Sequence, residues 1–194
     1  MTRIYLVRHA QAVQDSQADE AVLSELGKKQ AALVGQRLAG EKIRLLLASP
    51  LARARQTADT ISNFLKAPVL ETPGLEELNW RVWHKTGHWP FEEARTHIDE
   101  IESIEEQRAT LNRYQKKALL LLDQIYKEHH NQTLVIVTHG NVIRSILTGI
   151  LGAGVIGFLA IEIANTGLSL IEVGDRGHAK IVFINDHCHL KPLD

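Results

Sequence analysis

Apolar and polar residues alternate along this chain in two patterns, which predict strands and helices in turn. Short, continuous apolar runs that are rich in β-branched residues indicate buried strands. Three such runs lie at Thr2–Val7, Ile43–Ala48 and Thr133–Thr138. Apolar residues spaced by three or four positions indicate helices with one buried face. One such helix is predicted to begin after Ser24, a favoured N-cap residue, and to stop at Gly40.

The remaining segments continue the alternation. A helix follows the second strand from Leu51 until Pro68 interrupts its pattern. The other predicted elements are a short strand at Val69–Leu70, a structured loop over Thr72–Pro90, a helical stretch over Phe91–Glu128 with a break near Ser103 or Ile104, a helix over Val142–Leu151, and an antiparallel hairpin of Leu168–Val173 and Lys180–Ile184. This order predicts an α/β fold, a three-layer α/β/α sandwich in which helices cover both faces of a mostly parallel sheet.

Composition sets limits on the kind of protein this is. A length of 194 residues fits a single domain over residues 1–194. The chain is 44% apolar and 23% charged with a net charge of −1, so we expect no general attraction to nucleic acid or to membranes. Its single cysteine, Cys188, excludes a disulfide framework within the chain. Because the first residues also lack the apolar stretch of a signal peptide, we predict a cytoplasmic protein.

One segment, Ser145–Ile161, carries no charged residue. Several glycines interrupt it, and it is shorter than the roughly 20 apolar residues of a membrane helix. We therefore predict a buried helix followed by a loop. The alternative interpretation is a surface that pairs two copies of the chain in a homodimer.

Polar residues that could take part in catalysis or binding follow three of the predicted strands. Arg8 and His9 come directly after the first strand, Ser49 after the second, and His139 after the strand at Thr133–Thr138. In open α/β sheets, ligands bind in the crevice beyond the carboxyl ends of the strands. We therefore expect these side chains to lie close together, although they are far apart in sequence.

These residue types favour phosphoryl transfer. A neutral, oriented histidine such as His9 can attack phosphorus. The charge on the phosphate oxygens must be stabilised by cations and donors, for which Arg8, Arg53 and His139 are candidates. An alkoxide leaving group also needs a proton, which one of the adjacent Glu76 and Glu77 could deliver. Each residue alone is more often structural, and only their shared position at the strand ends supports an active site.

Six segments together resemble the motifs of the histidine phosphatase superfamily, also called phosphoglycerate mutase-like. They are LVRHAQA (6–12), LSELGKKQA (23–31), SPLARARQTA (49–58), LEELNW (75–80), VTHGNVIR (137–144) and INDHCHL (184–190). The resemblance implies that His9 is the phosphorylated nucleophile and that Arg8, Arg53 and His139 bind the phosphate. It also implies that Glu77, which follows the motif's Leu-x, is the general acid, and that the enzyme needs no metal or other cofactor.

The chain departs from the common family pattern at several positions. Ala10 and Gln11 replace the usual Gly and Glu after the Arg-His pair, and Asp15 stands where the family often has Asn. The short loop after His9 is similar to that of the bacterial phosphohistidine phosphatases. Unlike those enzymes, the chain has a predicted helical insertion over the active site, at about residues 80–130. The resemblance is therefore to a bacterial phosphatase-type branch, and the roles of Gln11 and Asp15 stay open.

The leading hypothesis is a phosphomonoesterase that acts on a small phosphorylated metabolite through a phosphohistidine intermediate. A phosphoglycerate mutase-type transfer, which requires a site closed to water, and a protein phosphohistidine phosphatase, which needs less acid assistance, are the alternatives. A non-catalytic phosphate-binding protein is disfavoured, because all five core residues are present.

Other polar and aromatic residues have plausible structural roles. Trp80, Trp83 and Trp89 could line a substrate pocket or form a small satellite core, and the two interpretations are evenly balanced. His187 and His189 are predicted to share one face of a strand in a structural role, because no further metal ligands cluster with them. Arg55 is expected to lie off the helix face that carries Arg53, and so at the surface or behind the site.

Overall fold

The computed structural model describes residues 1–13, 21–78 and 104–193 of the chain. Its centre is a six-stranded sheet whose spatial order is β3 (Val69–Glu71), β2 (Ile43–Ala48), β4 (Thr133–Thr138), β1 (Thr2–Arg8), β5 (Leu168–Val173) and β6 (Ala179–Asp186). The first four of these are mutually parallel, β5 is antiparallel to β1, and β6 is antiparallel to β5. The prediction of a mostly parallel sheet is therefore confirmed.

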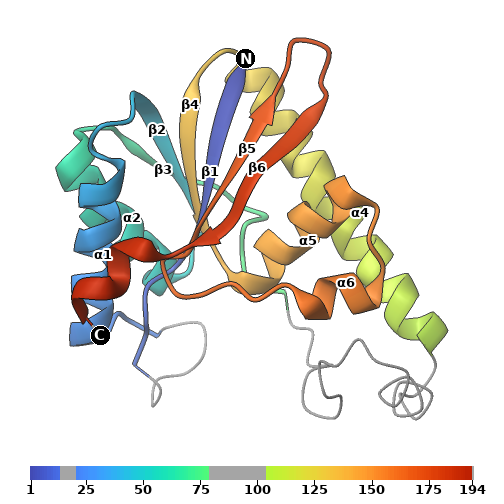
Figure 1. Ribbon diagram of the computed structural model, residues 1–194, viewed down its shortest axis with the longest axis horizontal. Helices are drawn as coiled ribbons and strands as arrows, with labels where there is room; N and C mark the ends of the chain where they lie inside the picture. The colour runs from blue at the N-terminus through green and yellow to red at the C-terminus, as the bar shows by residue number, and fades with distance from the viewer. Residues whose placement is uncertain (14–20, 79–103, 194) are drawn as a thin grey trace.

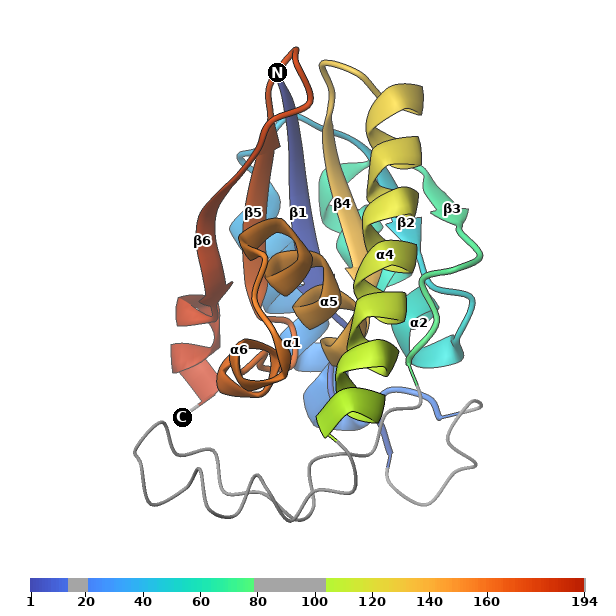
Figure 2. The same ribbon diagram turned by 90° about the vertical axis from the view of Figure 1, so that its right-hand side faces the viewer.

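Helices cover both faces of the sheet, as predicted (Figure 1). On one face lie α1 (Glu25–Leu38) and α2 (Ala52–Leu65), and on the other lie α4 (Ile104–Glu128) and α5 (Gly140–Leu151). Figure 2, seen from the side of α4 and α5, shows the sheet between the two helical layers. Short helices follow at α6 (Val155–Ala160) and at the 3₁₀ helix η2 (Cys188–Leu193), which lies against α1.

Two apolar cores, one on each side of the sheet, explain why the parallel strands are continuous apolar runs. In β1, Ile4 and Leu6 pack with the α4 and α5 layer, whereas Tyr5 and Val7 pack with α1 and α2. Successive side chains of a strand point to opposite faces, so a strand covered on both faces needs apolar residues at every position.

Most predicted element bounds agree with the structure, and the differences lie in short elements. Ser24 caps α1 as expected, since its hydroxyl accepts a hydrogen bond of 3.0 Å from the Gly27 N–H. The predicted loop after α5 is wrong in part, because residues 155–160 form α6. That helix has only six residues, too few to establish a helical period in the sequence. The predicted break near residue 103, and the rest of the predicted insertion before α4, lie outside the described residues.

The uncharged segment Ser145–Ile161 contributes both to the core and to the surface. Phe158 is buried, whereas Leu151 and Ile156 are more than half exposed. Whether this surface pairs two copies of the chain stays a prediction. Among residues 1–13, 21–78 and 104–193, no helix is long and apolar enough to cross a membrane.

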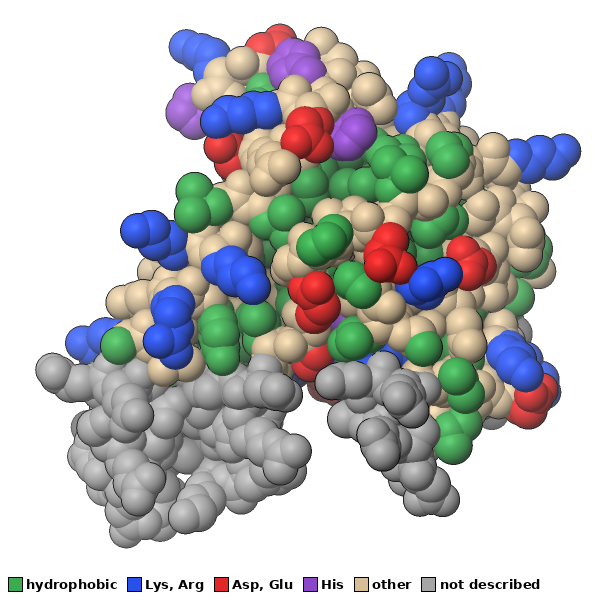
Figure 3. Space-filling view, turned by 180° about the vertical axis from the view of Figure 1, so that it is seen from behind, with side chains coloured by type: hydrophobic (Ala, Val, Ile, Leu, Met, Phe, Trp, Pro, Cys, Tyr) green, Lys and Arg blue, Asp and Glu red, His purple; other side chains and the backbone are tan. Residues whose placement is uncertain are grey.

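Charges of both signs are interspersed on the rear face of the molecule. Figure 3 shows acidic side chains among apolar ones near the middle of this face, with Lys and Arg toward its flanks. The described surface seen from this side therefore carries no single-sign field, in keeping with a net charge near zero.

Candidate active site

The carboxyl ends of β2, β4 and β1 lie next to one another, because these strands are parallel neighbours in the sheet. The residues that follow them therefore meet at one edge. His139 Nε2 lies 2.8 Å from Ser49 Oγ, and the ring centroids of His9 and His139 are 5.0 Å apart. The structure thus brings together residues that lie 130 positions apart in sequence, as the strand-end argument predicted.

The His9 ring is oriented by hydrogen bonds on both nitrogens. Its Nδ1 lies 2.8 Å from the Ala10 carbonyl oxygen, and a carbonyl can only accept, so Nδ1 carries the ring proton. The lone pair is then on Nε2, to which Arg53 Nε donates at 3.3 Å. The backbone on either side is also held: Asn165 Nδ2 donates to the His9 carbonyl at 2.9 Å, and the Ala10 N–H donates to Thr57 Oγ1 at 3.0 Å.

Both active-site histidines are held in the neutral form. Burial lowers the pKa of His9 to about 3, and the positive charges of Arg8 and Arg53 act in the same direction. Burial likewise lowers the pKa of His139 to about 2, with further lowering from His9, Arg53 and Arg8. A neutral imidazole is the form that can act as a nucleophile, and His9 has this form at neutral pH.

Arg8 lies at the centre of the site, beside the start of α5. Its Nη1 donates to the Ile163 carbonyl at 2.6 Å, and its guanidinium packs against Gly140, where a Cβ would lie 3.7 Å from Arg8 Nε. Within the described part of the chain, two buried nitrogens of this cluster have no hydrogen-bond partner, Arg8 Nε and His139 Nδ1. Buried polar atoms are rarely left unpaired, so unpartnered nitrogens beside a buried cation indicate a place for an anion.

Two helix N-termini add to the positive character of this edge. Arg53 lies in the first turn of α2, whose N-cap residue Leu51 makes no side-chain capping bond in the described structure. His139 is the N-cap of α5 and makes none either. Because the partial positive charge of a helix N-terminus attracts anions, both helices favour a phosphate group at this edge.

Of the two adjacent glutamates, Glu77 has the properties of a general acid. The Glu76 carboxylate accepts a hydrogen bond of 2.7 Å from the Gly74 N–H and so belongs to the local turn. Burial raises the pKa of Glu77, whereas the N–H of Leu78, the positive charges of Arg8 and Arg53, and the N–H of Asn141 act against that rise. A raised pKa keeps a carboxylic acid protonated closer to neutral pH, ready to protonate a leaving group.

Several residues at the site had no assigned role in the sequence interpretation. Asn165 and Thr57 hold the backbone around His9, as described above. Arg144 lies within the quoted VTHGNVIR segment, but only the fold shows that its guanidinium reaches the Asn141 side chain, at 3.3 Å. Gln11 proves to be part of the α1 cap, because its Oε1 accepts a hydrogen bond of 2.7 Å from Ser24 Oγ. Asp15 and the three tryptophans lie outside the described residues.

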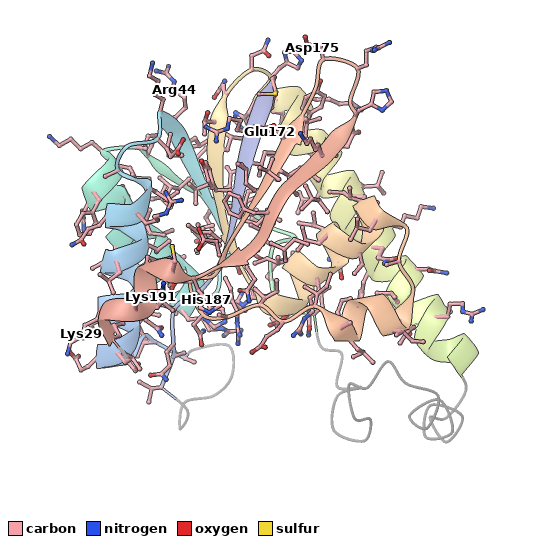
Figure 4. All side chains as sticks on the ribbon, viewed as in Figure 1. Lys29, Arg44, Glu172, Asp175, His187 and Lys191 are labelled. Atoms are coloured by element: carbon pink, nitrogen blue, oxygen red, sulfur yellow. The ribbon has the colours of Figure 1, made fainter. Side chains whose placement is uncertain are left out.

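The structure also shows where three residues outside the candidate site lie. The prediction that His187 and His189 share a strand face is wrong, because β6 ends at Asp186 and His189 lies in η2 (Figure 4 labels His187 between the two). His189 Nε2 lies 3.1 Å from Thr166 Oγ1, a structural contact. Arg55 is exposed and forms an ion pair of 3.1 Å with Glu71, as expected for a surface residue. In the part of the chain that the structure describes, no three His, Cys, Asp or Glu residues are grouped as metal ligands.

Comparison with known proteins gives consistent matches. Residues 4–187 match the family model of the histidine phosphatase superfamily (branch 1). Phosphoserine phosphatase 1 of Hydrogenobacter thermophilus is 28% identical over 98% of this chain and 95% of its own length. The metal-independent phosphoserine phosphatase of Arabidopsis thaliana is 26% identical over 91% of this chain and 78% of its own. A crystal structure of a phosphoserine phosphatase variant from Entamoeba histolytica with phosphoserine has the same fold, with a TM-score of 0.75 at 23% identity, covering 98% of this chain and 100% of that chain.

Proposed function

Because this chain belongs to branch 1 of the histidine phosphatase superfamily, we propose that it hydrolyses the phosphate ester of a small metabolite through a phosphohistidine intermediate on His9. That the protein is a phosphatase follows from the family and from relatives that are themselves phosphatases. The residue roles and the intermediate are the finer proposal, and they rest on the geometry of the site.

The observation that carries the proposal is a neutral histidine inside a buried, positively charged cradle. His9 Nε2 has the lone pair, since Nδ1 is committed to the Ala10 carbonyl. Arg8 and Arg53 both bring positive charge to this ring. Buried cations need anionic partners, and a phosphate dianion between them would also give Arg8 Nε and His139 Nδ1 an acceptor.

In the first step the Nε2 lone pair of His9 attacks phosphorus, and the bond to the leaving oxygen breaks. Glu77 gives its proton to that oxygen, so the product leaves as a neutral alcohol. Arg53 Nε, which donates to Nε2 in the free enzyme, is then available for the phosphate oxygens. With Arg8 and His139 it would stabilise the charge that develops on them.

In the second step a water molecule attacks the phosphorus of phosphohistidine. The Glu77 carboxylate accepts a proton from this water, and the electrons of the N–P bond return to His9 Nε2. Inorganic phosphate leaves, and Glu77 is protonated again for the next cycle. Every group in both steps belongs to the chain or to its substrates, in accordance with the metal-independent chemistry that the name of the plant relative describes.

Phospho-L-serine is the first substrate to test, because two of the relatives are phosphoserine phosphatases. Enzyme mixed with ³²P-labelled phospho-L-serine and quenched in alkali should carry label that is stable to base and released by acid, as expected for phosphohistidine. His9→Ala should carry none and lose turnover, whereas the surface variant Arg55→Ala should behave like wild type. Undiminished turnover by His9→Ala would overturn the proposal. With 3-phosphoglycerate, which has a second hydroxyl, formation of the phosphate isomer in place of free phosphate would indicate a mutase.

A further inference from the structure

We propose that Asn141 and Arg144, on the first turns of α5, are positioning residues that hold Glu77 in place to protonate the leaving group. The inference rests on the role proposed for Glu77. It adds two residues, neither in the phosphate cradle, whose loss should affect the proton-transfer part of the reaction and leave the attack on phosphorus largely intact.

The acid-bearing segment needs such support, because the loop that carries Glu77 belongs to neither a helix nor a strand. The loop is held at one end by Thr138, whose Oγ1 donates to the Leu75 carbonyl at 2.6 Å. It is held at the other end by Asn141, whose Nδ2 donates to the Leu78 carbonyl at 3.1 Å. Glu77 lies between these two attachment points, so its backbone is fixed from both sides.

The Asn141 backbone N–H hydrogen-bonds the Glu77 carboxyl group directly, and the Asn141 side chain reaches it through a single residue. The Leu78 N–H donates to Glu77 Oε1 at 3.0 Å, while the Leu78 carbonyl is the acceptor for Asn141. Asn141 is buried, with 7% of its surface exposed, so little water can take over this role. Loss of the Asn141 amide would therefore free the residue that orients the carboxyl group.

Arg144 decides which way the Asn141 amide points. Its Nη1 donates to Asn141 Oδ1 at 3.3 Å, which leaves the amide nitrogen directed at the Leu78 carbonyl. The guanidinium is itself anchored, since Nε donates to the Ile161 carbonyl at 2.5 Å and the group lies over the Phe158 ring, 5.9 Å from its centroid. Burial lowers the pKa of Arg144 to about 10, in keeping with its position inside the structure.

A matched pair of substrates separates acid positioning from every other role. The leaving group of phospho-L-serine is the serine alkoxide, which needs a proton. The leaving group of p-nitrophenyl phosphate is a stable phenolate, which does not. Asn141→Ala and Arg144→Met should lower the rate of phosphoenzyme formation, measured by rapid quench, by about 100-fold with phospho-L-serine and by less than about threefold with p-nitrophenyl phosphate. Arg144→Lys keeps the charge but has no planar fork to hold both acceptors, so its loss should be intermediate.

Two reference variants distinguish the loss of acid positioning from general damage to the fold. Thr148→Val removes hydrogen bonds one turn further along α5, to Gln115 and to the Arg144 carbonyl. It should change the rates with the two substrates by the same factor. Glu77→Gln should show the full loss with phospho-L-serine and little loss with p-nitrophenyl phosphate. The alkaline limb of the pH profile for phospho-L-serine should disappear as well.

If Glu77→Gln discriminates between the substrates but Asn141→Ala and Arg144→Lys do not, the positioning proposal is overturned and the proposed function stands. If Glu77→Gln does not discriminate, the acid role assigned to Glu77 fails, and the positioning proposal fails with it. A rise in KM at unchanged kcat for the Arg144 variants would also overturn the proposal, because it would mark Arg144 as a direct substrate contact.

Discussion

Acidification should destabilise this protein well above the pH at which its carboxylates titrate, because two histidines are buried in the neutral form. The folded pKa values are about 3 for His9 and about 2 for His139, against an ordinary value of 6.5. Below pH 6.5 the unfolded chain binds protons that the folded chain does not, so stability falls as the pH falls. Each pH unit below 6.5 costs about 1.4 kcal/mol per histidine, or about 2 kcal/mol each at pH 5.

Together the pair should therefore lower the free energy of unfolding by about 4 kcal/mol between pH 7.5 and pH 5. Both folded pKa values lie well below 5, so the loss at pH 5 depends mainly on the unfolded pKa. For a chain of this size the change corresponds to a fall of about 8–16 °C in Tm. Glu77 acts in the opposite sense, since its pKa is raised on folding and its protonation favours the folded state. His189, whose pKa is lowered by burial, adds to the loss.

Urea titrations at both pH values, in buffers free of phosphate, measure this effect. His139→Gln isolates one contribution, because the amide nitrogen of Gln can replace Nε2 beside Ser49 but does not titrate. The pH dependence of the variant should be smaller than that of wild type by about 2 kcal/mol. Equal pH dependence in the two proteins would refute the buried, neutral state of His139 from which this expectation is derived.

Three further substitutions test the packing and chemistry around the same edge of the sheet. Gly27→Ala should lower the free energy of unfolding by about 1–3 kcal/mol, because its Cβ would overlap a backbone oxygen in the loop after β1. The control in the same urea titration is Gly40→Ala, whose Cβ would have nothing within 4 Å. Arg53→Lys should lower kcat by about 100-fold in steady-state assays, and a loss no larger than that of the exposed Arg55→Lys would argue against a role in phosphate binding. Asn165→Ala removes the 2.9 Å hydrogen bond to the His9 carbonyl. It should slow phosphoenzyme formation about fivefold in rapid-quench experiments, and an unchanged rate would show that this bond is dispensable.

The strands and the general position of the site were predictable because both follow from local pattern. Parallel strands buried on both faces must be apolar throughout, so β2 and β4 could be delimited to the residue from the sequence. The polar residues just beyond those strands then had to meet at one edge of the sheet. Helices α6 and η2 were missed because six residues make at most two turns and establish no periodicity.

The sequence by itself determined which residue types stand at the strand ends and in the helix turn that follows β2, and so which side chains meet at one edge of the sheet: Arg8, His9, Arg53 and His139. Only the tertiary structure decided their chemical states. The proton of His9 resides on Nδ1 because of a carbonyl contact, and both histidines are neutral because they are buried. Glu76 is committed to a turn, whereas burial raises the pKa of Glu77. Protonation and orientation depend on burial and on through-space contacts between residues distant in sequence, and these exist only once the chain has folded.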